Sequence, residues 1–269
     1  MSSLQLRAAS ALVAVIGVAL VTYYWRADGL VFLSSVCVLL VVREFARLVF
    51  TGALRFAFIA SCAIIYAACV FSPNNALPIF AVLGLVLQSW VMGRSARGSA
   101  PRDVYIIQGF VALGLLYCAI LPSFTVRLLF LDDGLVLFAT FLLTTFAGDV
   151  AAYFTGLRFG RKKLLASVSP KKTVEGSIGG LLGSTLTAAL CAHFFSLPLI
   201  VFIPLGVLTG ALGQIGDLFE SLVKRVADVK DSGSIMPGHG GMWDRLDGIY
   251  FSAPFFYFVV SQLQAFLDL

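Results

Sequence analysis

The sequence has little charge for its length. Only 12% of its 269 residues are Asp, Glu, Lys or Arg, whereas 59% are hydrophobic. A soluble domain usually carries about 25% charged and about 45–50% apolar residues. The apolar residues here also form runs of about 18 or more, the length that a helix needs to cross a bilayer. These proportions exclude an ordinary soluble domain and predict an all-α polytopic integral membrane protein.

Motifs that would indicate other classes of site are also missing. The sequence has no CxxC pair, and its five cysteines lie inside apolar runs, where we interpret them as small hydrophobic side chains. The motif GxxxxGKS/T is absent, which excludes a P-loop nucleotide site. The first apolar run ends in bulky aromatic residues up to Trp25, so we expect a retained span and not a cleaved signal peptide.

Nine apolar segments are expected to form transmembrane helices. Their approximate bounds are 7–25, 30–49, 53–71, 76–92, 104–121, 134–155, 176–195, 198–222 and 246–266. Of the 19 basic residues, 17 fall at one end of these segments, and only Arg26 and Arg127 fall at the other end. By the positive-inside rule, the N-terminus is expected in the cytoplasm and the C-terminus outside.

The few carboxylates are unevenly distributed along the chain. Six of the 14 fall between Asp217 and Asp247. Asp217, Glu220 and Lys224 are spaced i, i+3 and i+7, which places them on one face of a helix. Asp244 and Asp247 lie three residues apart at the start of the last expected helix, which again places them on one face.

Asp149 lies within the sixth apolar run. For a single carboxylate in a span, a structural hydrogen bond or snorkelling is the alternative explanation. The expected topology, however, brings Asp149 to the same membrane depth as Asp217 and Asp244. Carboxylates at one level would repel one another without a cation, and Mg²⁺ takes oxygen ligands from one or two carboxylates and from substrate phosphates. We therefore expect a magnesium and phosphate site.

The loop after the sixth segment carries a second group of basic residues. The run Ser169–Gly176 predicts a turn that leads into a helix start, with Thr173 as the helix cap. Backbone N–H groups at a helix start attract phosphate, so Lys171 and Lys172 are candidate phosphate ligands. For Lys162–Lys163, a basic loop that only sets the topology is an alternative explanation.

The segment Ser221–Gly248, SLVKRVADVKDSGSIMPGHGGMWDRLDG, resembles the signature of phosphatidate cytidylyltransferases, the CDP-diacylglycerol synthases. The matching positions are Ser221, Lys224, Arg225, Lys230, Asp231, Pro237, His239, Gly240, Gly241, Asp244, Arg245 and Asp247. Upstream, Asp149, Ser169–Gly176 and Gly216–Ser221 are also similar to that family. The resemblance covers residues 145–255, and the first five spans match only in being hydrophobic.

The resemblance implies an Mg²⁺-dependent nucleotidyltransferase that makes CDP-diacylglycerol and pyrophosphate from CTP and phosphatidic acid, for phospholipid biosynthesis. It implies that Asp217 and Asp244 are catalytic metal ligands and that Lys224 and Arg245 are catalytic. The implied substrate-binding residues are Lys171, Lys172, Ser169, Ser221, Arg225, Lys230, Asp231, His239, Gly240, Gly241, Asp247 and Asp149. The glycines around His239 would let the backbone approach the nucleotide closely. Whether a monovalent ion accompanies Mg²⁺ stays open.

The expected organisation is an N-terminal transmembrane region, residues 1–125, followed by a catalytic transmembrane region, residues 126–269. The expected partners are CTP, phosphatidic acid and membrane lipids, without nucleic acid, and a homodimer is left open. The expected location is the bacterial inner membrane, with the active site facing the cytoplasm. One alternative is another CTP-dependent lipid enzyme, of the polyprenol or phytol kinase type. A less favoured one is an ion-coupled transporter, which usually binds its ions near the midplane and often has internal repeats.

Overall fold

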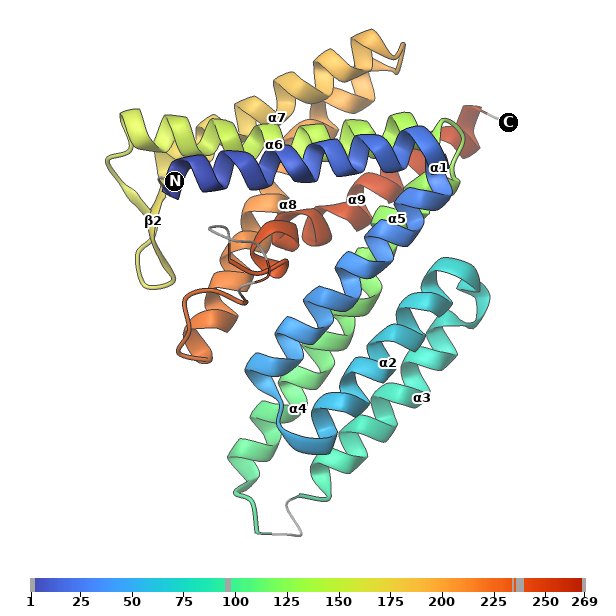
Figure 1. Ribbon diagram of the computed structural model, residues 1–269, viewed down its shortest axis with the longest axis vertical. Helices are drawn as coiled ribbons and strands as arrows, with labels where there is room; N and C mark the ends of the chain where they lie inside the picture. Colours follow the sequence, from blue (N-terminus) through green and yellow to red (C-terminus); the bar gives the residue numbers. More distant parts are fainter. Residues whose placement is uncertain (1–2, 95–97, 234, 236–239, 268–269) are drawn as a thin grey trace. The chain divides into compact units, whose positions relative to one another are not determined.

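The computed structural model describes residues 3–94, 98–233, 235 and 240–267 of the chain (Figure 1). Its elements are α1 (Ser3–Val49), α2 (Gly52–Phe71), α3 (Pro73–Met92), α4 (Pro101–Leu115), a π-helical turn η2 (Leu116–Ile120), α5 (Leu121–Arg127), a 3₁₀ turn η3 (Leu128–Phe130), α6 (Gly134–Phe159), β1 (Lys163–Leu165), β2 (Ser169–Thr173), α7 (Val174–Phe194), α8 (Leu199–Val226) and α9 (Trp243–Leu267). Apart from the β1–β2 sheet, the described elements are helical, so the predicted all-α fold is confirmed.

Seven helical stretches within the described residues are long and apolar enough to cross a membrane. They are Ile16–Val49, Gly52–Phe71, Pro73–Met92, Pro101–Phe130, Gly134–Phe159, Val174–Phe194 and Leu199–Val226. The polytopic membrane protein predicted from composition is therefore confirmed. The count of nine spans and the sides on which the termini lie stay predictions.

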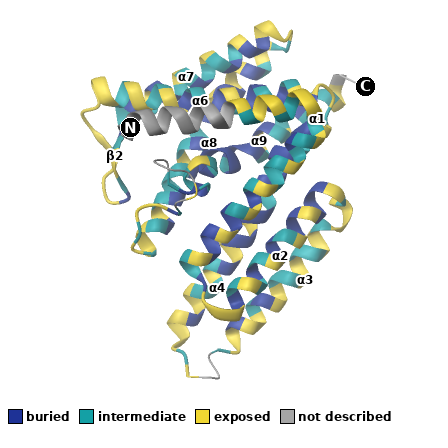
Figure 2. Cartoon of the chain, in the orientation of Figure 1, coloured by how far each residue is buried: buried dark blue, intermediate teal, exposed yellow. Residues whose placement is uncertain are grey.

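The exposed surface of α3 fits a membrane environment. Leu87 and Val91 are its buried side chains. Leu77, Val82 and Leu85 are 75%, 60% and 68% exposed, and most of this helix is coloured as exposed or intermediate in Figure 2. Large apolar side chains exposed in this number would aggregate in water, whereas they are stable against lipid tails.

Helix α1 contains the two segments that the sequence predicted separately. The segments expected at 7–25 and 30–49 are two helical stretches that meet at a kink at Arg26, whose φ is 47° and ψ is −132°. A positive φ is uncommon for a residue other than glycine and interrupts the helical hydrogen-bond ladder. The polar break between the two apolar runs is therefore a kink and not a loop.

The chain forms two compact units. The first contains residues 1–126 together with 231–243, and the second contains 127–230 together with 244–269. In the first unit, the rings of Phe45, Phe50 and Phe58 contact one another, with centroids 4.7–6.2 Å apart. The segment 231–243, which the sequence analysis grouped with the C-terminal region, thus packs with the N-terminal helices.

Helices α6, α7 and α8 pack against one another in the second unit. Small residues allow this close approach: a Cβ at Gly180 would lie 3.0 Å from the Cβ of Ala152 on α6 and 3.0 Å from Nε2 of Gln214 on α8. The Nε2 atom of Gln214 also donates a hydrogen bond of 3.0 Å to the carbonyl oxygen of Ser177 on α7. These contacts fix α8, the helix that carries the acidic face predicted from sequence.

The run that begins at Ser169 was expected to be a turn leading into a helix, and the turn is wrong, because Ser169–Thr173 forms strand β2. Strand β2 pairs antiparallel with β1, with Lys163 opposite Thr173 and Leu165 opposite Ser169. The hairpin is closed at its base by Glu175, which accepts hydrogen bonds from the backbone N–H groups of Arg161 (2.9 Å) and Lys162 (3.2 Å).

The predicted start of α7 is confirmed. Thr173 is the N-cap, and its Oγ1 accepts a hydrogen bond from the N–H of Gly176 at 3.1 Å. This bond satisfies one of the free N–H groups in the first turn of the helix.

Candidate active site

Lys224 is the centre of a buried group of three charges in the second unit. Its Nζ lies 2.7 Å from Oε2 of Glu220, one turn earlier on α8, and 2.5 Å from Oδ1 of Asp244 in the first turn of α9. The side chains of Lys224, Glu220 and Asp244 are 12%, 3% and 9% exposed. One ammonium therefore holds two carboxylates, and it does so where little water can screen their charges.

A second ion pair joins the β-hairpin to α8. Nζ of Lys172 on β2 lies 2.6 Å from Oδ2 of Asp217, and the two side chains are 28% and 26% exposed. The spacing of Asp217 and Glu220 on α8 is the one read from the sequence. It brings one carboxylate to Lys172 and the other to Lys224.

Two further carboxylates lie close to this ion pair. Asp149 on α6 is within electrostatic reach of Asp217, Lys172 and Arg245. Asp247 on α9 is 8% exposed, and its carboxyl group lies within hydrogen-bonding reach of that of Asp217. Its Oδ1 atom also accepts a hydrogen bond from the N–H of Gly248 at 2.9 Å.

These residues form what we call the acidic cluster. It consists of the carboxylates Asp149, Asp217, Glu220, Asp244 and Asp247 and the cations Lys172, Lys224 and Arg245. With every group ionised, the five carboxylates exceed the three cations by two charges. The acidic cluster thus contains residues from α6, β2, α8 and α9 that are up to 98 positions apart in the sequence.

The chemistry of the acidic cluster fits a divalent cation that binds together with a substrate. Five carboxyl groups close together supply the oxygen ligands that such a cation binds, and Oε1 of Glu220 is buried without a hydrogen-bond partner. Among the described residues, however, no group of three or more His, Cys, Asp or Glu side chains has the arrangement of a preformed metal site. Mg²⁺ needs only one or two carboxylates when substrate phosphates complete its coordination.

The remaining predicted site residues lie around the acidic cluster or outside the described part of the chain. Ser169 and Lys171 lie on β2, and Ser221 and Arg225 lie on α8. The guanidinium Nε of Arg225 donates to the carbonyl oxygen of Val168 at 3.4 Å, which connects the end of α8 to the hairpin. Lys230 is the last residue of the 127–230 stretch of the second unit. Asp231 is the first residue of the 231–243 stretch, which belongs to the first unit.

The glycine-rich segment, residues 232–243, contains glycines with a structural role that the sequence analysis did not identify. His239 lies outside the described residues. Gly240 has a φ of 86°, a conformation that favours glycine. A Cβ at Gly241 would clash with Oγ of Ser232 and would lie 2.5 Å from Oε2 of Glu44 and 2.7 Å from the backbone nitrogen of Gly233, so the backbone packs closely against other parts of the protein at this position. Its approach to a nucleotide stays a prediction.

Glu44 was missed by the sequence analysis. It lies near the end of α1, is 3% exposed, and accepts hydrogen bonds from Ser232, Met242 and Trp243 in the first unit. Its neighbours Arg43 and Arg47 were interpreted only as basic residues that set the topology. The overlooked signal was a carboxylate at the end of an apolar run, which usually has a partner inside the protein.

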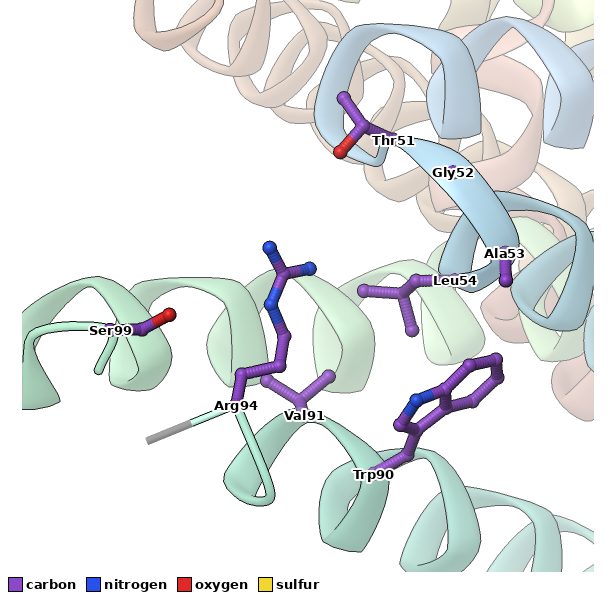
Figure 3. Close-up of a pocket in the computed structure, with 8 residues that line it drawn as sticks. All are labelled: Thr51, Gly52, Ala53, Leu54, Trp90, Val91, Arg94 and Ser99. Carbon is purple, nitrogen blue, oxygen red and sulfur yellow. The ribbon is translucent and has the colours of Figure 1, made fainter. Parts of the chain in front are cut away.

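The first unit also contains a cavity of about 380 Å³ that is separate from the acidic cluster (Figure 3). It lies between the start of α2, the end of α3 and the following loop. Its lining residues are Thr51, Gly52, Ala53, Leu54, Trp90, Val91, Arg94 and Ser99. None of them is a carboxylate or a predicted substrate-binding residue, so the cavity does not belong to the candidate site.

Comparison with known proteins identifies a family for the whole chain. A model of the cytidylyltransferase family matches residues 5–263. A phosphatidate cytidylyltransferase of Bacillus subtilis is 37% identical over 156 residues, which are 57% of this chain and 58% of the relative. One of Thermotoga maritima is 34% identical over 208 residues (75% and 74%), and one of Synechocystis is 41% identical over 186 residues (58% and 63%).

The alignments with the Bacillus and Synechocystis proteins span less than two thirds of those relatives. The family model, in contrast, extends over nearly the whole chain, from the first helix to the last. The protein therefore belongs to the cytidylyltransferase family.

Proposed function

We propose that this membrane protein transfers the cytidylyl group of CTP to phosphatidic acid. A phosphate oxygen of phosphatidic acid attacks the α-phosphorus of CTP, the bond from that phosphorus to the bridging oxygen breaks, and pyrophosphate leaves. The product is CDP-diacylglycerol. The observation that carries this proposal is the acidic cluster, which combines cations and carboxylates in a chain similar to named phosphatidate cytidylyltransferases.

The reaction joins two polyanions, so the main task of the protein is to neutralise and align phosphates. Lys172 suits this task because its side chain is 28% exposed and, among the described residues, it forms its ion pair with Asp217. On substrate binding, its ammonium can turn from Asp217 to a phosphate oxygen. Lys171 and Arg245 are exposed, and we assign them further phosphate contacts.

Asp217 and Asp244 are the residues that would hold Mg²⁺, with Asp149 and Asp247 as further candidates. When bound, the ion would supply positive charge at the phosphate oxygens of CTP. Each of the two principal carboxylates is held by a lysine, Lys172 or Lys224. We infer that these lysines keep the carboxylates oriented before substrate arrives and limit their mutual repulsion.

We place the acidic cluster at the cytoplasmic side of the inner membrane. The support for this placement is the excess of basic residues at one end of the apolar segments. Cytosolic CTP and a lipid headgroup could both reach a site at that depth. A position at the membrane surface also agrees with the high fractional exposure of Lys171 and Arg225.

The test separates cytidylyl transfer from a CTP-dependent lipid kinase. Purified protein receives phosphatidic acid and CTP labelled at either the α- or the γ-phosphate. We expect α-label in chloroform-soluble lipid, γ-label in released pyrophosphate, and loss of both products on chelation of divalent ions, with recovery on addition of Mg²⁺. Lipid labelled only from the γ-phosphate, with CDP as by-product, would overturn the proposal.

A further inference from the structure

Glu44 joins two stretches of the first unit that are far from it in the sequence. Its Oε2 accepts a hydrogen bond from Oγ of Ser232 at 2.9 Å and another from the N–H of Trp243 at 2.9 Å. Its Oε1 accepts a third from the N–H of Met242 at 3.0 Å. Ser232 and Trp243 lie at the two ends of the glycine-rich segment, so one carboxylate ties both ends together.

The backbone is adapted to this carboxylate. A Cβ at Gly233 would lie 2.5 Å from Oε1 of Glu44, and a Cβ at Gly241 would lie 2.5 Å from Oε2. A Cβ at Gly241 would also clash with Oγ of Ser232, which itself donates to Glu44. Both glycines therefore allow the backbone to pack closely around Glu44 and Ser232.

Glu44 accepts hydrogen bonds from the backbone N–H groups of Met242, just before α9, and of Trp243, the first residue of α9. Free N–H groups at a helix start carry partial positive charge, and a negative side chain there is stabilising. A nearby Ser or Asp could provide such a cap at little cost. Here the cap is a buried carboxylate almost 200 positions earlier in the sequence, which must lose its hydration to reach the site. Within the first unit, Glu44 therefore fixes the backbone of Met242 and Trp243, the two residues from which α9 starts.

Trp243 strengthens the same attachment. Its side chain is fully buried, its ring centroid lies 5.3 Å from that of Phe45, and its Nε1 donates to the hydroxyl of Tyr117 at 3.0 Å. Asp244 is the next residue in the chain, and Asp247 follows one turn later.

We propose that Glu44 is a positioning residue for cytidylyl transfer, one that holds the start of α9 and thereby orients Asp244. This inference rests on the proposed function, in which Asp244 is a metal ligand. Glu44 itself touches neither substrate nor metal in this scheme.

The test compares Glu44→Gln with Asp103→Asn, which removes a carboxylate charge from an exposed position in the first turn of α4. A glutamine at position 44 has only one acceptor oxygen. Its NH₂ group must therefore face at least one of the three donors, which are on Ser232, Met242 and Trp243. We expect kcat to fall about 10- to 100-fold, because a small misplacement of a catalytic group costs about that much. The Mg²⁺ concentration for half-maximal rate should rise about tenfold, whereas Asp103→Asn should behave like the native protein.

A second readout needs no catalysis. In a Trp25→Phe, Trp90→Phe background, Trp243 is the sole tryptophan of the chain, and its emission reports its own burial. Without substrate, Glu44→Gln should shift this emission to longer wavelength, and Asp103→Asn should not. The emission tests the attachment even when the native protein shows no cytidylyl transfer, so failure of this inference and failure of the proposed function are distinguishable.

Ser232→Ala covers the case in which Glu44→Gln does not fold. It removes one donor and leaves both backbone bonds to Glu44, so we expect a folded protein with kcat reduced about three- to tenfold. Native kcat in either variant overturns the proposal. A reduced kcat with unchanged Trp243 emission and unchanged Mg²⁺ dependence also overturns it, because a general loss of active protein would produce that result.

Discussion

Lys224→Met should destabilise the second unit by about 3–5 kcal/mol, the usual cost of leaving buried charges without their partner. The Nζ atom lies 2.7 Å from Glu220 and 2.5 Å from Asp244, so the two carboxylate oxygens are at most about 5 Å apart. At an effective dielectric constant of about 20, two ionised carboxylates at about that distance repel each other by about 3 kcal/mol, and this is an upper limit because either group can take up a proton instead. With side chains no more than 12% exposed, solvent reduces this repulsion little.

The measurement is the free energy of unfolding in detergent, obtained by denaturant titration. Adding Glu220→Gln to Lys224→Met removes one of the two facing charges and should recover about 2–3 kcal/mol, most of the calculated repulsion. Lys171→Met, at an exposed position on β2, is the matched control and should change stability by less than about 0.5 kcal/mol. A Lys224→Met protein within about 1 kcal/mol of native, or no recovery in the double variant, would refute this reasoning.

Two further predictions concern the hairpin and the orientation of the chain. Lys172→Gln should lower kcat/KM for CTP about tenfold, because it removes a cation from the acidic cluster, whereas Lys163→Gln on β1 should leave kcat/KM unchanged; equal effects would contradict our assignment of phosphate contacts to Lys172. In a background without native cysteines, Ser167→Cys should react with membrane-impermeant thiol reagents only from the cytoplasmic side. Labelling from the outside of intact cells would contradict the orientation.

Local spacing in the sequence was sufficient to predict the parts of the site that lie on one helix. The i, i+4 pair of Glu220 and Lys224 follows from helix geometry, and the structure places their charged atoms 2.7 Å apart. The cap at Thr173 followed in the same way from a polar residue before an apolar run. The strand β2 could not be read from its residues because Ser-Pro-Lys-Lys-Thr has little of the apolar alternation that indicates a strand.

Local sequence patterns could not predict the contacts between segments that are distant in the sequence. Nothing in the spacing of Glu44 relates it to Ser232, 188 positions later, or to Trp243. Gly241 was likewise interpreted only through the family resemblance, and Gly233 was not interpreted, since the closeness of both to Glu44 is visible only in three dimensions. Clustering of the acidic residues, in contrast, could be predicted, because the expected membrane depth placed Asp149, Asp217 and Asp244 in one region.

The most direct test of the central claim is transfer of α-labelled CMP from CTP to phosphatidic acid by native protein and by Asp244→Asn, measured side by side. The substitution keeps the size of the side chain and removes its charge. We predict that native protein forms labelled CDP-diacylglycerol and pyrophosphate, and that folded Asp244→Asn is slower by about a thousandfold, equivalent to about 4 kcal/mol of transition-state stabilisation. Equal rates for the two proteins would contradict the account, because the acidic cluster would then not be the site of the reaction.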